Sequence, residues 1–199
     1  MHKKSNNTLF LRPTDPQEIL TIVSKLSNSC SKDINNISNK LLKLLIDPLA
    51  EVLSYLFNLS FEKGTFPNCF KTTKVVPIFK SGCSHEVGNY RPISIISSIS
   101  KVLEKLAKIR LTLFLSKNEL LVCQQFGFRQ GLSTEIALTA FLNDVYKNCN
   151  LGLYSLSVFI DFTKAFDSIK HSILLKKLEL YGIRGIPLSY FHSYLENRQ

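Results

Sequence analysis

The stretch Val158-Phe-Ile-Asp-Phe-Thr-Lys-Ala-Phe-Asp167 decides the fold that this sequence predicts. Residues 156–160, just ahead of Asp161, form an apolar run with the composition of a buried β-strand. A carboxylate at the end of such a strand is suited to hold a hard divalent cation such as Mg²⁺, which prefers oxygen ligands. In phosphoryl transfer that cation activates the attacking and leaving oxygens. Asp161 could equally cap a following helix, so the stretch alone leaves both interpretations open.

The composition indicates a folded, basic protein. The chain has 199 residues, 45% hydrophobic and 20% charged, so it can bury a core and form one or two domains. The formal net charge of +10 is uneven: residues 66–199 hold seventeen Lys/Arg and nine Asp/Glu, whereas residues 1–65 hold eight and six. A basic excess around Asp161 favours a polyanionic partner such as nucleic acid, although ordinary surface lysines produce the same balance.

Other features exclude several protein classes. The five cysteines are odd in number and never spaced C-x-x-C, which argues against a disulfide framework or a zinc site and for a reducing compartment. No apolar run approaches the roughly 20 residues needed to span a bilayer. The start of the chain lacks the apolar core of a secretory signal. We therefore expect an intracellular protein, nuclear or cytoplasmic, that is not secreted and has no membrane partner.

The first third of the chain reads as helical. Asp15-Pro16 is typical of an N-cap followed by the first residue of a helix. A second helical pattern covers residues 34–46. Asp47-Pro48 then predicts the start of a third helix, and Gly64 lies just beyond its expected end.

A β-hairpin is predicted next. Residues 74–79 and 93–96 have strand composition, and a loop through Gly88 joins them. Pro77 restricts the first strand to an edge or a bulge. Lys80 and Arg91 then lie on the two arms near the loop, where they are either solvated charges or ligands for an anion.

Four further helices are expected after the hairpin. A helix from Ser100 carries a basic face that a phosphate backbone could contact, unless it is merely solvated. That face consists of Lys101, Lys105, Lys108 and Arg110. A glycine loop then leads to Ser133 or Thr134, which caps a helix to about Lys147. The residues of that helix expected to face inward are Ile136, Ala137, Ala140, Phe141 and Val145. Two closing helices cover residues 168–181, before Gly182, and the chain from about residue 187 onward.

Together these segments resemble the front part of the reverse transcriptase of non-LTR (LINE-type) retrotransposons. The matching stretches are Gly64-Thr-Phe-Pro67, Lys74-Val-Val-Pro-Ile-Phe-Lys80, Asn89-Tyr-Arg-Pro-Ile-Ser94, Ser100-Lys-Val-Leu-Glu-Lys105, Gln125-Phe-Gly-Phe-Arg129, Gly131-Leu-Ser-Thr134, Phe159-Ile-Asp-Phe-Thr-Lys-Ala-Phe-Asp167 and Ser193-Tyr-Leu-Glu-Asn-Arg-Gln199. Each motif is weak alone, but their order and spacing agree with that family over residues 9–199.

The resemblance implies roles at the centre of a polymerase. Asp161 would be the catalytic carboxylate and the first ligand of two Mg²⁺ ions, with the backbone carbonyl of Phe162 as a further oxygen ligand. Phe166 would lie against the sugar of the incoming dNTP and exclude a 2′-hydroxyl, unless it is a plain core residue. Lys80 and Arg91 would bind the triphosphate, where positive charge neutralises the charge that develops during transfer.

The resemblance also implies a template track lined by Gln125, Arg129 and Ser133. Arg129 could equally tie down its own glycine loop. Asp167 is not assigned to metal; it would orient the site or pair with Lys164 or Lys170. His171 is expected to finish the start of the helix from Ser168 rather than to transfer a proton.

The expected architecture is α+β. Residues 1–65 would be a helical N-terminal extension, and residues 66–199 a partial reverse transcriptase domain, with fingers over 66–150 and the start of the palm over 151–199. The sequence contains no Asp-Asp pair, which the family supplies from a later hairpin. A two-metal polymerase needs at least two carboxylates close together. We therefore expect a C-terminally truncated right-hand polymerase that is inactive alone.

The partners implied are an RNA template, a DNA primer and dNTPs. Three alternatives stay open: a catalytically dead remnant that still binds RNA, a helical interaction protein with no nucleic-acid role, and a group II intron-type maturase. The form of Asn89-Tyr-Arg-Pro-Ile-Ser94 favours the non-LTR type over the maturase. The sequence leaves the oligomeric state and the template RNA open.

Overall fold

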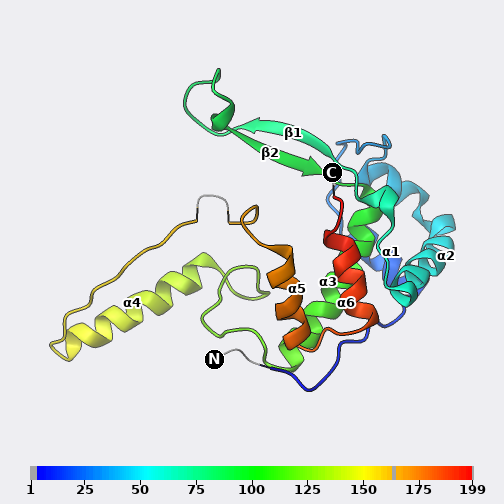
Figure 1. Cartoon of the computed structure of the whole chain (residues 1–199). Coiled ribbons are helices and arrows are strands. Elements are labelled where there is room, and N and C mark those ends of the chain that lie inside the picture. Colours follow the sequence, from blue (N-terminus) through cyan, green and yellow to red (C-terminus); the bar gives the residue numbers. More distant parts are fainter. Residues whose placement is uncertain (1–3, 163–164, 199) are drawn as a thin grey trace.

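The computed structural model describes residues 4–162 and 165–198. Within them the elements are α1 (Pro16–Ser24), α2 (Asn39–Lys63), β1 (Lys74–Phe79), β2 (Tyr90–Ile95), α3 (Ser98–Lys117), α4 (Thr134–Asn150), α5 (His171–Leu180) and α6 (Ile186–Leu195). Short 3₁₀ turns, Asn68–Phe70 and Val87–Asn89, precede the two strands. Figure 1 shows a helical body containing α1, α2, α3 and α6, from which the hairpin and α4 extend. The mixture of helices with few strands agrees with the predicted α+β class.

Local capping signals placed several helix ends correctly. The Asp15 carboxylate accepts a hydrogen bond from the Glu18 backbone N–H at 2.7 Å, and Pro16 is the first residue of α1. Gly64 ends α2 in the left-handed conformation, with φ of 62°. Ser133 caps α4 by accepting from the Ile136 N–H. These predictions are confirmed because each depends on contacts within a few residues.

The predicted division of α2 at Asp47-Pro48 is wrong. One helix runs from Asn39 to Lys63 with Pro48 inside it, and it begins after Ser38 rather than at residue 34. Proline inside a helix removes one backbone hydrogen bond. Burial of one continuous face on both sides of Pro48, with Leu42 before it and Phe57 after it, offsets that cost.

The expectation that no apolar segment could span a bilayer needs a correction. Among the described helices, α2 is long and apolar enough by length and composition to cross a membrane. Core helices pass the same test, and one face of α2 is packed inside the helical body.

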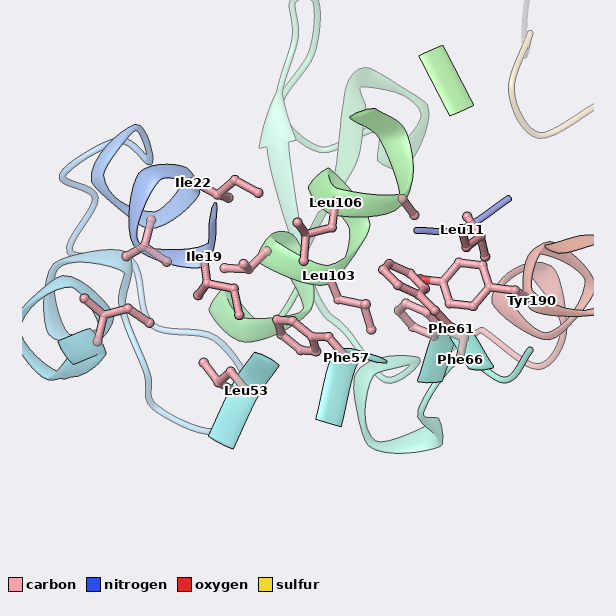
Figure 2. Close-up of a cluster of buried hydrophobic side chains, with 14 of the residues drawn as sticks. Leu11, Ile19, Ile22, Leu53, Phe57, Phe61, Phe66, Leu103, Leu106 and Tyr190 are labelled. Carbon is pink, nitrogen blue, oxygen red and sulfur yellow. The ribbon is translucent and has the colours of Figure 1, made fainter. Parts of the chain in front are cut away.

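The core joins distant parts of the chain. Figure 2 shows Ile19 of α1, Phe57 and Phe61 of α2, Leu103 of α3 and Tyr190 of α6 in one cluster. All five side chains are at most 3% exposed. Elements from both sides of residue 65 therefore share one core, and the division into a 1–65 extension and a 66–199 domain stays a prediction.

The hairpin is confirmed. β1 and β2 pair antiparallel from Lys74 opposite Ile95 to Phe79 opposite Tyr90. Pro77 lies opposite Pro92. Since neither proline has a backbone N–H, that pair can form no ladder hydrogen bond between its two residues, which suits a two-stranded ribbon.

The inward face predicted for the helix from residue 134 is not observed. Within the described residues α4 has no buried side chain, and Ile136, Phe141 and Val145 are all at least partly exposed. Helical periodicity identified a face able to be buried, but α4 extends away from the helical body (Figure 1). α5 likewise has no buried residue and begins at His171, three residues after the predicted start.

Candidate functional site

The strand predicted ahead of Asp161 is not formed. Residues 153–162 have no regular secondary structure, and Tyr154, Leu156 and Phe159 are between 83% and 103% exposed. A β-strand requires a hydrogen-bonded neighbour, and no described residue pairs with this segment. The alternative that Asp161 caps a helix is excluded too, because the next helix begins at His171 after Lys170.

The described residues do not form a complete magnesium site. Asp161 is exposed, and its carboxylate and the Phe162 carbonyl supply only two kinds of oxygen ligand. Mg²⁺ requires near-octahedral coordination. No group of three or more His, Cys, Asp or Glu that could hold a metal occurs in the described part of the chain. Asp161 therefore needs further carboxylates before it can hold two cations.

Lys80 and Arg91 lie where the hairpin prediction put them. Lys80 directly follows β1, and its backbone N–H donates to the Asn89 carbonyl at 2.8 Å. Arg91 is paired with Ile78. Because alternate residues of a strand share a face, this register puts Lys80 and Arg91 on one face of the hairpin. Both side chains are exposed. Exposure fits a solvated charge and an anion-binding residue equally well.

The Lys80 and Arg91 side chains form no polar contact with Asp161 in the part of the chain that the structure describes. Among the described residues, no hydrogen bond or ion pair links Asp161 to Lys80 or Arg91. A shared cleft of these three side chains stays a prediction.

The Asn-Tyr-Arg-Pro motif has a structural role that the sequence interpretation missed. The Asn89 side-chain amide donates to the Cys83 carbonyl at 2.9 Å and to the Glu86 carboxylate at 3.1 Å. The Tyr90 hydroxyl donates to the Ser84 carbonyl at 2.9 Å. Gly82 has φ of 96°, a turn conformation that glycine favours. Asn89 and Tyr90 thus hold closed the loop between Lys80 and Arg91.

The three residues predicted to line a template track take local partners. Gln125 donates to the Gly127 carbonyl at 3.3 Å, and Arg129 donates to the Val122 carbonyl at 3.0 Å. Ser133 caps α4. For Arg129 this is the alternative left open by the sequence, in which the guanidinium ties down its own loop.

Phe166 contacts an aromatic ring from another motif. Its ring lies edge-on to that of Phe128, with centroids 5.9 Å apart. The two side chains are 74% and 90% exposed, so neither belongs to the core, and the plain-core interpretation of Phe166 is wrong. A similar pair, Phe141 and Phe159 at 5.7 Å, joins α4 to the segment that carries Asp161. These contacts place the glycine-loop motif beside the acidic motif.

The remaining acidic-motif residues are only partly placed. Asp167 is exposed and forms no ion pair with any described residue. Its suggested partner Lys164 lies outside the described residues. His171 is the first residue of α5, whereas the sequence predicted that the helix begins at Ser168 and that His171 completes its start.

The basic face of α3 is smaller than predicted, because Arg110 is buried. Lys101, Lys105 and Lys108 border a hollow of about 420 Å³ between α3 and α6, which Phe191 and Tyr194 also line. Arg110 is only 3% exposed and lies on the opposite side, against α1. Helical spacing could not separate Arg110 from the lysines, because its burial depends on a carboxylate 92 residues away.

Two other motifs meet in space. The Phe66 N–H donates to the Ser193 hydroxyl at 3.0 Å, although 127 residues separate them. Arg198 donates to Glu104 of α3 at 2.8 Å, and its guanidinium lies 4.3 Å from the Tyr194 ring centroid. Burial raises the pKa of Tyr194, so its phenol stays neutral. We call Phe66, Ser193, Arg198 and Glu104 the clasp.

Residues 78–199 match the family model described as reverse transcriptase (RNA-dependent DNA polymerase). Over 196 residues, 96% of its length, the chain is 32% identical to a probable RNA-directed DNA polymerase from transposon BS of Drosophila melanogaster. It is 30% identical over 193 residues, 95% of its length, to the probable RNA-directed DNA polymerase from transposon X-element of the same organism. It is 28% identical over 162 residues, 81% of its length, to the RNA-directed DNA polymerase from mobile element jockey, also of that organism. The chain spans 21%, 21% and 18% of these three relatives, about a fifth of their length.

Proposed function

Because the chain belongs to the reverse transcriptase (RNA-dependent DNA polymerase) family, we propose that it is part of an enzyme that extends a DNA primer with dNTPs on an RNA template. The observation that carries this proposal is the family match over residues 78–199, which includes the hairpin arm with Arg91 and the segment with Asp161. The non-LTR retrotransposon relatives favour an element of the same type, working in the nucleus or the cytoplasm.

We assign the parts of a right-hand polymerase along the chain. Residues 66–150 with the hairpin would act as fingers, residues 151–199 would begin the palm, and residues 1–65 would be a helical extension packed beneath them. The contact between Phe128 and Phe166 supports this order, since it joins the end of the fingers segment to the start of the palm segment.

Asp161 would supply one carboxylate of a two-cation centre. The sequence holds no Asp-Asp pair, and we propose that other parts of the polymerase supply the remaining carboxylates. In a polymerase that contains this chain, Asp161→Asn should abolish primer extension by at least 100-fold while RNA affinity changes less than two-fold. Asp144→Asn, which changes an exposed carboxylate on α4, is the matched control. The 199-residue chain alone should extend no primer; steady incorporation by it would overturn the need for further carboxylates.

Lys80 and Arg91 would bind the triphosphate of the dNTP. Their shared face offers a point charge and a planar fork, which together suit phosphate oxygens. Lys80→Ala and Arg91→Ala in the polymerase should each raise the KM for dNTP about ten-fold, if each forms one charge-assisted hydrogen bond. Lys74→Ala, at the far end of β1, is the control. An unchanged KM for both variants would show that Lys80 and Arg91 are solvated charges that do not bind the dNTP.

Phe166 would exclude a 2′-hydroxyl at the sugar of the incoming nucleotide. Phe166→Ala should therefore allow ribonucleotide incorporation, whereas Phe128→Ala, which removes the contacting ring, should not. The ratio of kcat/KM for dGTP to kcat/KM for GTP, measured for both variants, distinguishes the effect of Phe166→Ala from that of Phe128→Ala. Equal ratios in the wild type and in Phe166→Ala would contradict the proposed role of Phe166 in excluding the 2′-hydroxyl.

A second candidate function, RNA binding without extension, is favoured by the hollow between α3 and α6. Lysines beside aromatic rings, here the half-buried Lys101 and Lys105 and the exposed Lys108, are suited to single-stranded nucleic acid through phosphate contacts and base stacking. Replacing Lys101, Lys105 and Lys108 by Ala should lower RNA affinity and reduce its salt dependence, with each lost phosphate contact lowering the log–log slope by about 0.7. No salt dependence in the parent chain would instead support an interaction protein without a nucleic-acid role.

A further inference from the structure

The loop between the two hairpin arms is bordered by Asn89 and Tyr90. Asn89 lies opposite Lys80 at the end of the ladder, where its carbonyl accepts a hydrogen bond from the Lys80 N–H at 2.8 Å, and it is two residues before Arg91. Tyr90 is the first residue of β2, and its ring lies edge-on to that of Phe79 with centroids 5.5 Å apart. Asn89 and Tyr90 are therefore the immediate neighbours of the two cations proposed to bind the triphosphate.

Three hydrogen bonds from the Asn89 and Tyr90 side chains close the loop. The Asn89 amide bonds to the Cys83 carbonyl and to the Glu86 carboxylate, so it ties two points of the loop together. The Tyr90 hydroxyl bonds to the Ser84 carbonyl, between those two points. Removing either side chain would leave loop groups without these partners, and the loop would then be free to open.

Gly82 completes the closed loop because it allows the Asn89 amide to approach the backbone. Its φ is 96°, and a Cβ there would lie 2.8 Å from Asn89 Nδ2. Of residues 77–94, only Asn89 and Tyr90 are half-buried, and the others are exposed. The shape of the loop therefore depends on these local contacts more than on burial.

We infer that Asn89 and Tyr90 are positioning residues for the dNTP: they keep the loop closed so that Lys80 and Arg91 are presented together to one triphosphate. The inference rests on the proposed binding of the triphosphate by those two cations, and neither positioning residue needs to touch the nucleotide. An open loop would let the two charges separate. The triphosphate would then bind only the fraction of molecules in which the loop is closed, which raises the apparent KM.

Kinetics of the polymerase that contains this chain test the role of each side chain. Asn89→Ala should raise the KM for dNTP about five-fold, as expected if the loop is closed about a fifth of the time. Tyr90→Phe keeps the ring and removes only the hydroxyl, and should raise the KM about two-fold. Ser81→Ala, which changes an exposed side chain of the same loop, is the matched control and should leave the KM unchanged. An unchanged KM for Asn89→Ala would overturn the inference.

The value of kcat distinguishes positioning from damage to the catalytic step. At saturating dNTP the bound triphosphate itself holds the loop closed, so kcat should stay within about two-fold of the wild type in Asn89→Ala and Tyr90→Phe. Gly82→Ala should reproduce the raised KM, because its Cβ would displace the Asn89 amide. A fall in kcat at an unchanged KM in these variants would contradict a role in positioning the cations.

A polymerase that lacks both cations provides the decisive background. In the double variant Lys80→Ala and Arg91→Ala, adding Asn89→Ala should change the KM by less than about 1.5-fold, because no charges remain to be positioned. A further five-fold rise would show that Asn89 acts through another contact, and would overturn the inference.

The same set of variants separates the two proposals. If Lys80→Ala and Arg91→Ala leave the KM unchanged, the proposed function of the cations fails and the positioning role falls with it. If those variants raise the KM and Asn89→Ala does not, only the positioning role is wrong.

Inorganic triphosphate, used as a competitive inhibitor, tests whether the effect lies at the phosphates. Its inhibition constant should rise in Asn89→Ala by the same factor as the KM for dNTP, since it carries the phosphates without the sugar and base. A raised KM with an unchanged inhibition constant would place the effect at the sugar or the base and would refute the inference.

Discussion

Arg110 on α3 donates to both carboxylate oxygens of Glu18 on α1, at 3.0 and 2.8 Å. The same guanidinium donates to the backbone carbonyls of Arg12 and Pro13. The Arg110 side chain is 2% exposed and that of Glu18 is 21% exposed, so water screens the pair little. One side chain thus fixes the N-terminal segment and α1 to the helix that follows the hairpin.

Removing Arg110 should destabilise the fold strongly. Arg110→Ala leaves Glu18 without its main partner in a largely buried site and should lower the free energy of unfolding by about 3 kcal/mol or more. Arg110→Lys should retain only part of the stability that Arg110→Ala loses, because an ammonium cannot make the bidentate contact. Urea unfolding measures both. Lys108→Ala, exposed on the same helix, is the control, and a loss as large as that of Arg110→Ala would contradict the role of the pair.

The same pair predicts a dependence of stability on pH. The hydrogen bond from Arg110 lowers the pKa of Glu18 below its ordinary value of 4.5, against an opposing effect of desolvation. A carboxylate whose pKa is lower in the folded state contributes stability above its unfolded pKa and loses that contribution as pH falls through its folded pKa. The wild type should therefore lose stability more steeply than Glu18→Gln below about pH 4.5. Parallel curves of urea midpoint against pH would contradict this expectation.

Gly64 should tolerate no side chain. Its φ is 62°, and a Cβ there would lie 2.8 Å from the Ile186 backbone carbonyl oxygen. Gly64→Ala should lower the free energy of unfolding by more than about 1 kcal/mol, from strain at positive φ and the steric clash. Gly88→Ala is the control, because open space surrounds Gly88 and its φ is not positive. Thermal unfolding of the two variants should differ by several degrees, and equal melting temperatures would refute the steric argument.

Within the clasp, Arg198 and Glu104 should show measurable coupling. Arg198→Ala loses the ion pair and the contact with the Tyr194 ring, and should cost about 1–2 kcal/mol because the pair is only partly buried. A double-mutant cycle with Glu104→Gln isolates their interaction, expected near 1 kcal/mol. Additive effects of the two changes would show that the clasp gains its stability from aromatic packing alone.

Features that depend on neighbours in sequence were predictable. The hairpin, the Asp15 and Ser133 caps and the glycine at the end of α2 all follow from turn and capping chemistry over a few residues. The family could also be predicted from the sequence, because motifs such as those around Arg91 and Asp161 can be recognised by their order without any knowledge of their contacts. Their roles in catalysis stay predictions, since no contact among the described residues links Asp161 to Lys80 or Arg91.

By itself, the sequence determined the family, the hairpin and several helix ends. Only the tertiary structure decided that α2 continues through Pro48, that Arg110 is buried while Lys108 is exposed, and that the apolar run before Asp161 is not a strand. The physical reason is that burial and strand pairing require partners distant in sequence. Leu42 and Phe57 on one core face stabilise α2 across its proline, Glu18 neutralises Arg110, and residues 156–160 find no strand to pair with among the described residues.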